Sequence, residues 1–172
     1  MIRALDGITP KIHPTAFVSE AAYIVGDVEL GPNSSVWPGV VIRADSGKIK
    51  IGGGTNIQDN SVLHADADAE IGDNVTIGHG VVCHARNIGD GSLIGNGSTL
   101  NDGVVLGDNC LVAAGSTVTE NSVFEAHSLV RGTPGKAIGK IRTRHAELMS
   151  RAAASYVNRI ARYTASGLAH AD

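Results

Sequence analysis

The amino-acid sequence predicts an all-β protein, a parallel β-helix of hexapeptide repeats, followed by a C-terminal α-helix. Three observations predict this fold. An aliphatic residue recurs every six positions, the chain has 22 glycines but only two Phe, three Tyr and one Trp, and the apolar period becomes helical near the C-terminus. A helix bundle over the whole chain is excluded because so much glycine disfavours helix interiors. With 172 residues, the chain suits one domain.

The repeat is clearest in the second half of the chain, where seven successive anchor residues keep the six-residue period. A short strand and a sharp turn fit each six-residue unit, and three units make one triangular coil. Residues 18–130 would fill roughly six such coils, interrupted by insertions at residues 43–48 and between Leu63 and Ile71. The seven anchors are Ile88, Ile94, Leu100, Leu106, Val112, Val118 and Phe124.

After residues 131–135 the repeat stops, and apolar residues follow at helical spacing. This pattern predicts a helix that begins near Gly139 and ends near Ser166 and Gly167. We therefore divide the chain into a β-helix over residues 1–135 and a helix with a tail over residues 136–172, both in one domain. The helix is expected to pack along a side of the β-helix or across a subunit interface.

Charge and hydropathy indicate which classes of partner and which cellular location to expect. The net charge is -3 and no cluster of five Lys or Arg occurs, which disfavours a nucleic-acid partner. No apolar run approaches 18 residues and no signal-peptide pattern is present, so we expect no membrane association and a cytoplasmic location. Cys83 and Cys110 occupy apolar repeat positions, which predicts reduced, buried thiols.

Two histidines are predicted to stack. His64 follows anchor Leu63 and His84 follows anchor Cys83, with one coil of hexapeptides between them. They occupy the same repeat position on adjacent coils, so their side chains should lie about 5 Å apart. This spacing suits two imidazoles that bind one metal ion.

His79 lies in the neighbouring hexapeptide and points from a different part of the coil. We expect that it cannot reach the same metal within one chain. Two ligands from one subunit and the third from a neighbour would complete the site. The other four histidines are isolated in terminal, turn or helical positions, namely His13, His127, His145 and His170.

At these residues the sequence resembles the γ-class carbonic anhydrase family. The resemblance covers residues 10–165 and implies a left-handed β-helix, whose hand the repeat alone does not give, and a homotrimer. The matching motifs are Arg43-x-Asp45, Asn56-Ile57-Gln58-Asp59, His64, Ile77-Gly78-His79-Gly80, His84 and Tyr156-x-Asn158.

The resemblance implies a role for each matching residue. His64 and His84 of one subunit and His79 of the next would bind zinc, with iron or cobalt as possible substitutes. Gln58 would hydrogen-bond the reacting water, and Arg43 would face the substrate. The remaining matches are Asp45 and Asp59 as ion-pair partners of Arg43, Asn56 beside Gln58, and Tyr156 and Asn158 completing the pocket from the final helix. The implied reaction is the reversible hydration of carbon dioxide to bicarbonate.

Two other functions remain open at this stage. Many acyltransferases share hexapeptide repeats, and such an enzyme needs one histidine as general base and an acyl-CoA between coils, but no metal. A non-catalytic metal-binding protein related to the carbonic anhydrases is the third alternative. Metal content per subunit, measured together with hydration activity, separates the three.

Overall fold

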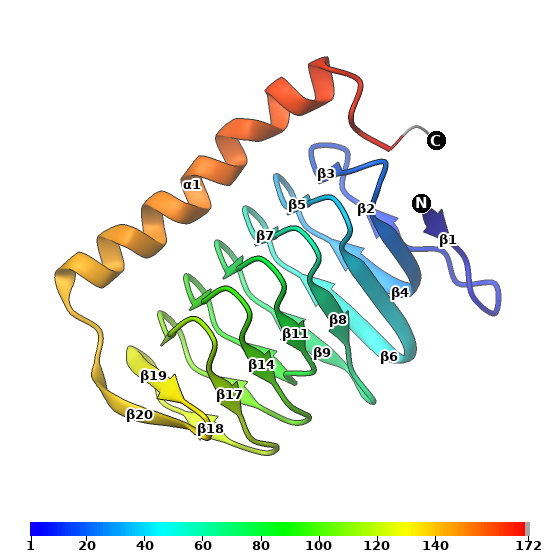
Figure 1. Ribbon diagram of the computed structural model, residues 1–172. Helices are drawn as coiled ribbons and strands as arrows, with labels where there is room; N and C mark the ends of the chain where they lie inside the picture. Colours follow the sequence, from blue (N-terminus) through cyan, green and yellow to red (C-terminus); the bar gives the residue numbers. More distant parts are fainter. Residues whose placement is uncertain (171–172) are drawn as a thin grey trace.

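The computed structural model describes residues 1–170 as a three-faced solenoid of short strands with one helix along its side (Figure 1). Two of the faces are parts of one 12-stranded sheet, joined where strand β6 turns from one face to the next. The strands of this sheet are β1 (Ile2–Arg3), β2 (Lys11–Ile12), β4 (Tyr23–Leu30), β6 (Val41–Ile51), β8 (Val62–His64), β9 (Ala69–Ile71), β11 (Val82–Cys83), β12 (Asn87–Ile88), β14 (Thr99–Leu100), β15 (Val105–Leu106), β17 (Thr117–Val118) and β18 (Val123–Phe124).

The third face is an 8-stranded sheet in which parallel strands from successive coils lie side by side. It comprises β3 (Phe17–Val18), β5 (Ser35–Val36), β7 (Asn56–Ile57), β10 (Thr76–Ile77), β13 (Leu93–Ile94), β16 (Leu111–Val112), β19 (Ser128–Gly132) and β20 (Gly135–Lys140). The first seven of these strands are parallel neighbours. The solenoid therefore has about seven turns, and the seven parallel strands from β3 to β19 enclose the six coil intervals that the repeat predicts between residues 18 and 130.

The core is a set of aliphatic columns that run along the solenoid axis. Register pairs Ile88 with Leu106 and Leu106 with Phe124, so that each anchor packs on the anchor one coil away. Ile94, Leu100 and Leu106 are fully buried. Each Å² of apolar surface that is buried stabilises the folded chain by about 25 cal/mol, so these columns make the main favourable contribution to folding. The sequence prediction of a parallel β-helix with a C-terminal helix is confirmed.

The predicted insertion at residues 43–48 does not form a separate loop. Strand β6 runs continuously from Val41 to Ile51 and pairs with β4 on both sides of an irregularity between Gly26 and Val28. Backbone pairing with β4 on both sides of this irregularity keeps the segment extended, which a period of six cannot reveal. The second insertion does form a turn, between β8 and β9.

The predicted helix start at Gly139 is wrong. Residues 135–140 form β20, which pairs antiparallel with β19 and closes the last coil. Helix α1 (Thr143–Ala165) begins after Arg142, whose backbone N–H donates to His145 Nδ1 at 3.1 Å. It ends just before Gly167, at the predicted position. The helix then runs back along the 8-stranded sheet toward the N-terminal coil (Figure 1).

Both cysteines are free and buried, as the repeat predicts. Burial raises the pKa of the Cys83 thiol to about 11 and also raises that of Cys110. These thiols therefore act as small apolar side chains. Among the described residues, no helix is long and apolar enough to cross a membrane.

One corner of the solenoid alternates asparagine and glycine. Asn74 and Asn109 have positive φ, as do the glycines one coil before them, Gly54 and Gly91. A Cβ on Gly54 would lie 2.6 Å from Asn74 Oδ1, and one on Gly91 would lie 2.7 Å from Asn109 Oδ1. Each asparagine side chain therefore occupies the space that the preceding glycine leaves open.

We predict that Gly91→Ala destabilises the protein more than Gly115→Ala. Both glycines have similar positive φ, of 65° and 68°, so the left-handed backbone costs each alanine about the same, ~1–2 kcal/mol. A Cβ on Gly115 meets no atom within 4 Å, whereas Gly91→Ala should cost a further ~1–3 kcal/mol of overpacking against Asn109. Denaturant unfolding measures both. Asn109→Gly in the Gly91→Ala background should remove the excess, and equal destabilisation by the two alanines would contradict this explanation.

Candidate metal centre

His64 and His84 lie on adjacent coils, and their imidazole rings are in contact. Strand β8 ends at His64, and His84 follows β11, in which Cys83 pairs with Leu63. The ring centroids are 5.1 Å apart and the ring planes are inclined by 68°. The separation of about 5 Å predicted from the repeat is confirmed, although the rings meet edge-on, and it follows from the parallel register of these two strands.

Asp45 holds one nitrogen of His64. Its Oδ1 lies 2.9 Å from His64 Nε2, while Oδ2 pairs with the Arg43 guanidinium. The hydrogen bond with His64, aided by Arg43, lowers the pKa of the Asp45 carboxyl. The other ring nitrogen, His64 Nδ1, is buried and has no hydrogen-bond partner among residues 1–170. An unsatisfied buried polar atom costs about 1–3 kcal/mol, so such atoms are expected at sites built for a ligand.

His84 has a carboxylate partner that the sequence reasoning missed. Asp102 Oδ1 lies 2.9 Å from His84 Nδ1. Asp102 comes 18 residues after His84, which is one coil of the solenoid. That spacing is the signal in the sequence that could have identified it.

His79 lies apart from this pair, at the turn between β10 and β11. Its Nδ1 is 3.0 Å from Asp59 Oδ2, and its Nε2 is 3.5 Å from the Tyr156 hydroxyl on α1. Within residues 1–170, no three His, Cys, Asp or Glu side chains of the chain are placed to hold one metal ion. One chain therefore brings together two of the three predicted ligands.

Comparison with known proteins identifies the relatives of this site. Residues 87–120 match the family described as bacterial transferase hexapeptide (six repeats). The chain is 37% identical over 158 residues to "Gamma carbonic anhydrase 2, mitochondrial" of Arabidopsis thaliana, covering 87% of this chain and 57% of that protein. It is 38% identical over 140 residues to "Carnitine operon protein CaiE" of Escherichia coli, covering 80% and 71% respectively. The chain belongs to the γ-carbonic anhydrase family.

A solved structure shares this fold. A "hexapeptide transferase family protein" from Anaplasma phagocytophilum superposes with a TM-score of 0.90 and 34% identity, covering 94% of this chain and 97% of that one. The chain spans a little over half, 57%, of the length of the Arabidopsis γ-carbonic anhydrase.

The residues present fit the divalent metal ion that a γ-carbonic anhydrase implies. Neutral imidazoles are suitable ligands for zinc, iron and cobalt. His64 and His84 each have one nitrogen held by an aspartate, which leaves the other nitrogen for a metal. The orphaned, buried Nδ1 of His64 is the observation in this structure that calls for such a partner.

The other predicted site residues differ in their surroundings. Gln58 is buried, and its Nε2 donates to Asn56 Oδ1 at 3.0 Å. Asn56 in turn donates to Thr76 Oγ1 at 2.9 Å. Asn158 is exposed and makes no side-chain hydrogen bond within residues 1–170.

Tyr156 owes its position to an aromatic cluster beneath α1. The Tyr156 and Tyr163 rings lie edge-on against Trp37, with centroids 5.1 and 4.8 Å away. Trp37 is itself fixed, because its Nε1 donates to Ser35 Oγ at 2.9 Å. Burial raises the pKa of the Tyr156 hydroxyl. The β-helix thus holds the helix that carries Tyr156 next to His79.

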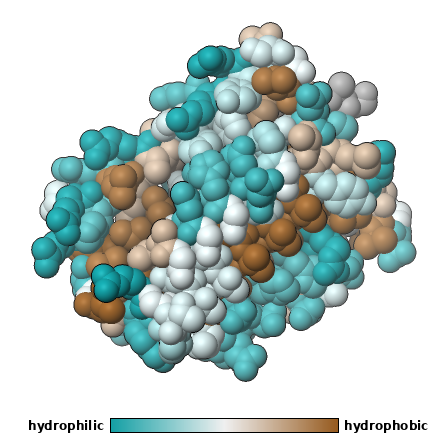
Figure 2. Space-filling model, in the orientation of Figure 1, coloured by the Kyte–Doolittle hydropathy of each residue, from teal (hydrophilic) through white to brown (hydrophobic). Residues whose placement is uncertain are grey.

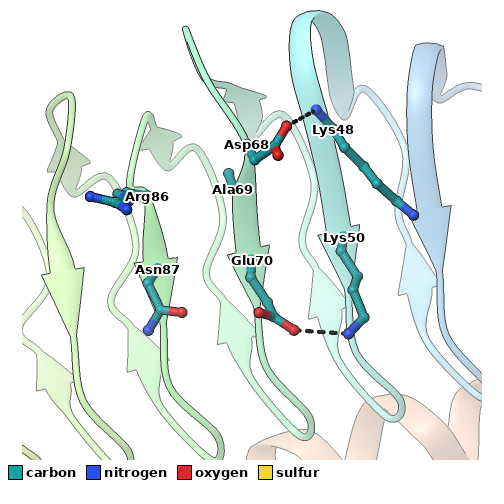
Figure 3. Close-up of a pocket in the computed structure, with 7 residues that line it drawn as sticks. All are labelled: Lys48, Lys50, Asp68, Ala69, Glu70, Arg86 and Asn87. Carbon is teal, nitrogen blue, oxygen red and sulfur yellow. Dashed lines mark hydrogen bonds and ion pairs between the residues drawn. The ribbon is translucent and has the colours of Figure 1, made fainter.

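A charged groove on another face of the solenoid was the alternative location for a functional site (Figure 3). It has a volume of about 360 Å³ and lies over β6, β9 and β12. Lys50 pairs with Glu70 at 2.9 Å, Lys48 pairs with Glu29, and Asp68 accepts the Lys48 backbone N–H at 2.9 Å. Its charges are largely neutralised in exposed pairs, whereas His64 is buried and its Nδ1 is unsatisfied within residues 1–170. We therefore place the functional site at the histidines.

We predict that Trp37→Ala releases α1 while the β-helix stays folded. Deleting a buried Trp side chain removes about 3–5 kcal/mol of packing, more than enough for a tenfold rise in local opening. Trypsin should then cleave faster at the arginines of α1, which are Arg144, Arg151, Arg159 and Arg162. Val123→Ala, at a side chain that is 72% exposed, serves as the control. Cleavage at the wild-type rate in Trp37→Ala would show that the aromatic cluster does not hold the helix.

Proposed function

We propose that this chain catalyses the reversible hydration of carbon dioxide to bicarbonate at a metal centre shared between subunits of a homotrimer. The observation that carries the proposal is the pair of stacked imidazoles, His64 and His84, 5.1 Å apart in a member of the γ-carbonic anhydrase family. The third ligand is His79 of a neighbouring subunit. Zinc is the proposed metal, and iron or cobalt would suit the same nitrogen ligands.

An apolar stripe supports the shared site. Val41, Val62 and Val82 are paired across neighbouring strands, and each projects outward from the face that contains β8 and β11. Val82 is 40% exposed, and Figure 2 shows apolar surface running across this face. Aligned valines on a flat sheet face are suited to cover by another copy of the chain. Val62 and Val82 lie two residues before His64 and His84, on the same outward face of their strands, so the proposed interface and the proposed site coincide.

In this site the chain supplies orientation and charge. When bound, a divalent metal with three nitrogen ligands makes water a nucleophile at neutral pH. Gln58 would hydrogen-bond the reacting water, and Asn56, which accepts from Gln58 Nε2, fixes the orientation of the Gln58 amide. Arg43, whose side chain is 48% exposed, faces the entering carbon dioxide while paired with Asp45. Carbon dioxide and water combine to give bicarbonate and one proton, which leaves to solvent.

A hexapeptide acyltransferase is the second candidate, favoured by the description of the matched repeat family and of the Anaplasma structure. His79 with Asp59 would be its general base, since the carboxylate orients the ring. This function needs neither metal nor the His64 and His84 pair. A metal-binding protein without fast turnover differs from the enzyme only in rate.

We predict that the purified protein binds one divalent metal per subunit and hydrates carbon dioxide, and that His84→Ala loses both. His145→Ala is the control, because His145 lies at the start of α1 and contacts Arg142 and Arg144. Metal analysis and stopped-flow hydration assays, with zinc and with anaerobically loaded iron, measure the two properties. Metal-free wild-type protein that acylates a test amine from acetyl-CoA would favour the acyltransferase. Bound metal without hydration would indicate the non-catalytic alternative.

A subunit-mixing experiment tests which histidines share a chain. His79→Ala and His64→Ala should each be nearly metal-free alone. When they are unfolded and reassembled together, random mixing should recover about a quarter of the wild-type sites, because each interface needs one intact pair and one intact His79. A mixture of His64→Ala and His84→Ala should recover none. Equal recovery from the two mixtures, with subunit exchange verified, would refute this assignment of ligands to chains.

A further inference from the structure

Four side chains from successive coils form a row along the solenoid axis. Asp45 contacts His64, His64 stacks with His84, and His84 contacts Asp102. The sequence separations of the two carboxylate contacts are 19 and 18 residues, one coil each. The row therefore has a carboxylate at each end and two imidazoles in the middle.

Asp102 determines which nitrogen of His84 is available. Its Oδ1 accepts a hydrogen bond from His84 Nδ1–H at 2.9 Å. A proton held on Nδ1 leaves the lone pair of the neutral ring on Nε2, the form in which imidazole binds a metal. The contact also fixes the rotation of the ring about its bond to Cβ. Asp102 thus prepares His84 as a ligand before any metal is present.

Carboxylate contacts single out the predicted ligands among the histidines. In the described part of the chain, His64, His79 and His84 have a carboxylate within ion-pair distance, and the other four histidines do not. His13 contacts the Thr15 hydroxyl instead, and His145 contacts the backbone N–H of Arg142. A chance surface contact would not favour these three positions.

We propose that Asp102 is a positioning residue for His84 and that it sets the metal affinity of the centre. This inference rests on the proposed function, in which His84 is a ligand. Asp102 is a cleaner test than Asp45, because the Asp45 carboxylate also pairs with Arg43 and is proposed to act near the substrate. The Asp102 side chain has His84 as its hydrogen-bond partner within residues 1–170.

The expected size of the effect follows from the exposure of Asp102. Carboxylates that hold a ligating histidine typically change metal affinity about 10- to 100-fold when removed. The Asp102 side chain is 59% exposed, so solvent screens its hydrogen bond. We therefore expect the low end of this range, about a tenfold weaker affinity for Asp102→Ala.

The test measures metal affinity independently of activity. Zinc and cobalt ions, each as the metal alone, are titrated into the full chain in competition with a chelator of known affinity. Asp102→Ala should raise the Kd about tenfold, and Asp102→Asn should raise it less, because the amide oxygen still accepts from Nδ1–H. Glu120→Gln is the matched control. Glu120 is exposed, makes no side-chain hydrogen bond within residues 1–170, and should leave the Kd unchanged.

The outcomes separate the two hypotheses. If wild-type protein binds metal and His84→Ala does not, but Asp102→Ala binds within twofold of wild type, the role of Asp102 is refuted while the metal centre stands. If wild-type protein and His84→Ala bind metal equally weakly, the metal centre itself is refuted. Thermal unfolding of the metal-free variants checks the fold. A weaker affinity of Asp102→Ala that is accompanied by a lower melting temperature of its metal-free form would make Asp102 structural and overturn the inference.

Discussion

Backbone hydrogen bonds between successive coils fix the register on which the rest of this structure depends. Parallel strands one coil apart lie about 4.8 Å from each other, so residues at the same repeat position become neighbours in space. For apolar anchors such as Leu100 and Val118, this register builds the buried columns. For Asn74 and Gly54 it requires alternation, because two side chains do not fit at the same corner. For His64 and His84 it brings two imidazoles to metal-binding distance.

The same register explains which features the sequence could predict. The period of six residues is repeated often enough that the fold, the stacked histidines and the burial of Cys83 and Cys110 follow from spacing alone. The end of α1 could also be predicted, because Gly167 adopts the positive φ that stops a helix. Each of these predictions depends on a residue and its own repeat position.

Features that depend on long-range partners could not be predicted in this way. β6 stays extended because β4 pairs with both of its ends, Val41–Ala44 and Ile49–Ile51, and β20 is a strand because β19 is available to pair with it. Asp102 makes its contact through a side chain that reaches one coil along the axis, one residue beyond the Asn101 that the register places opposite His84. The position of Tyr156 beside His79 depends on the packing of α1 against Trp37. Spacing within the repeat carries none of this information.

A solenoid of this kind has a geometric reason to share a three-ligand site between chains. Register alone supplies ligands along one line, and a third imidazole on the same column would lie about 10 Å from the first, twice the coil spacing and too far for bonds of about 2.0–2.1 Å to one zinc ion. The third nitrogen must therefore approach from outside the solenoid, across the face that contains the exposed Val82. Within residues 1–170, the chain itself places no third metal-ligating side chain beside the pair. His79 lies at a corner of the same coil, where it faces outward and is 48% exposed. A second copy that covers the valine stripe can bring its own His79 to the pair, so in the proposed centre association buries apolar surface and completes the ligand set in one step.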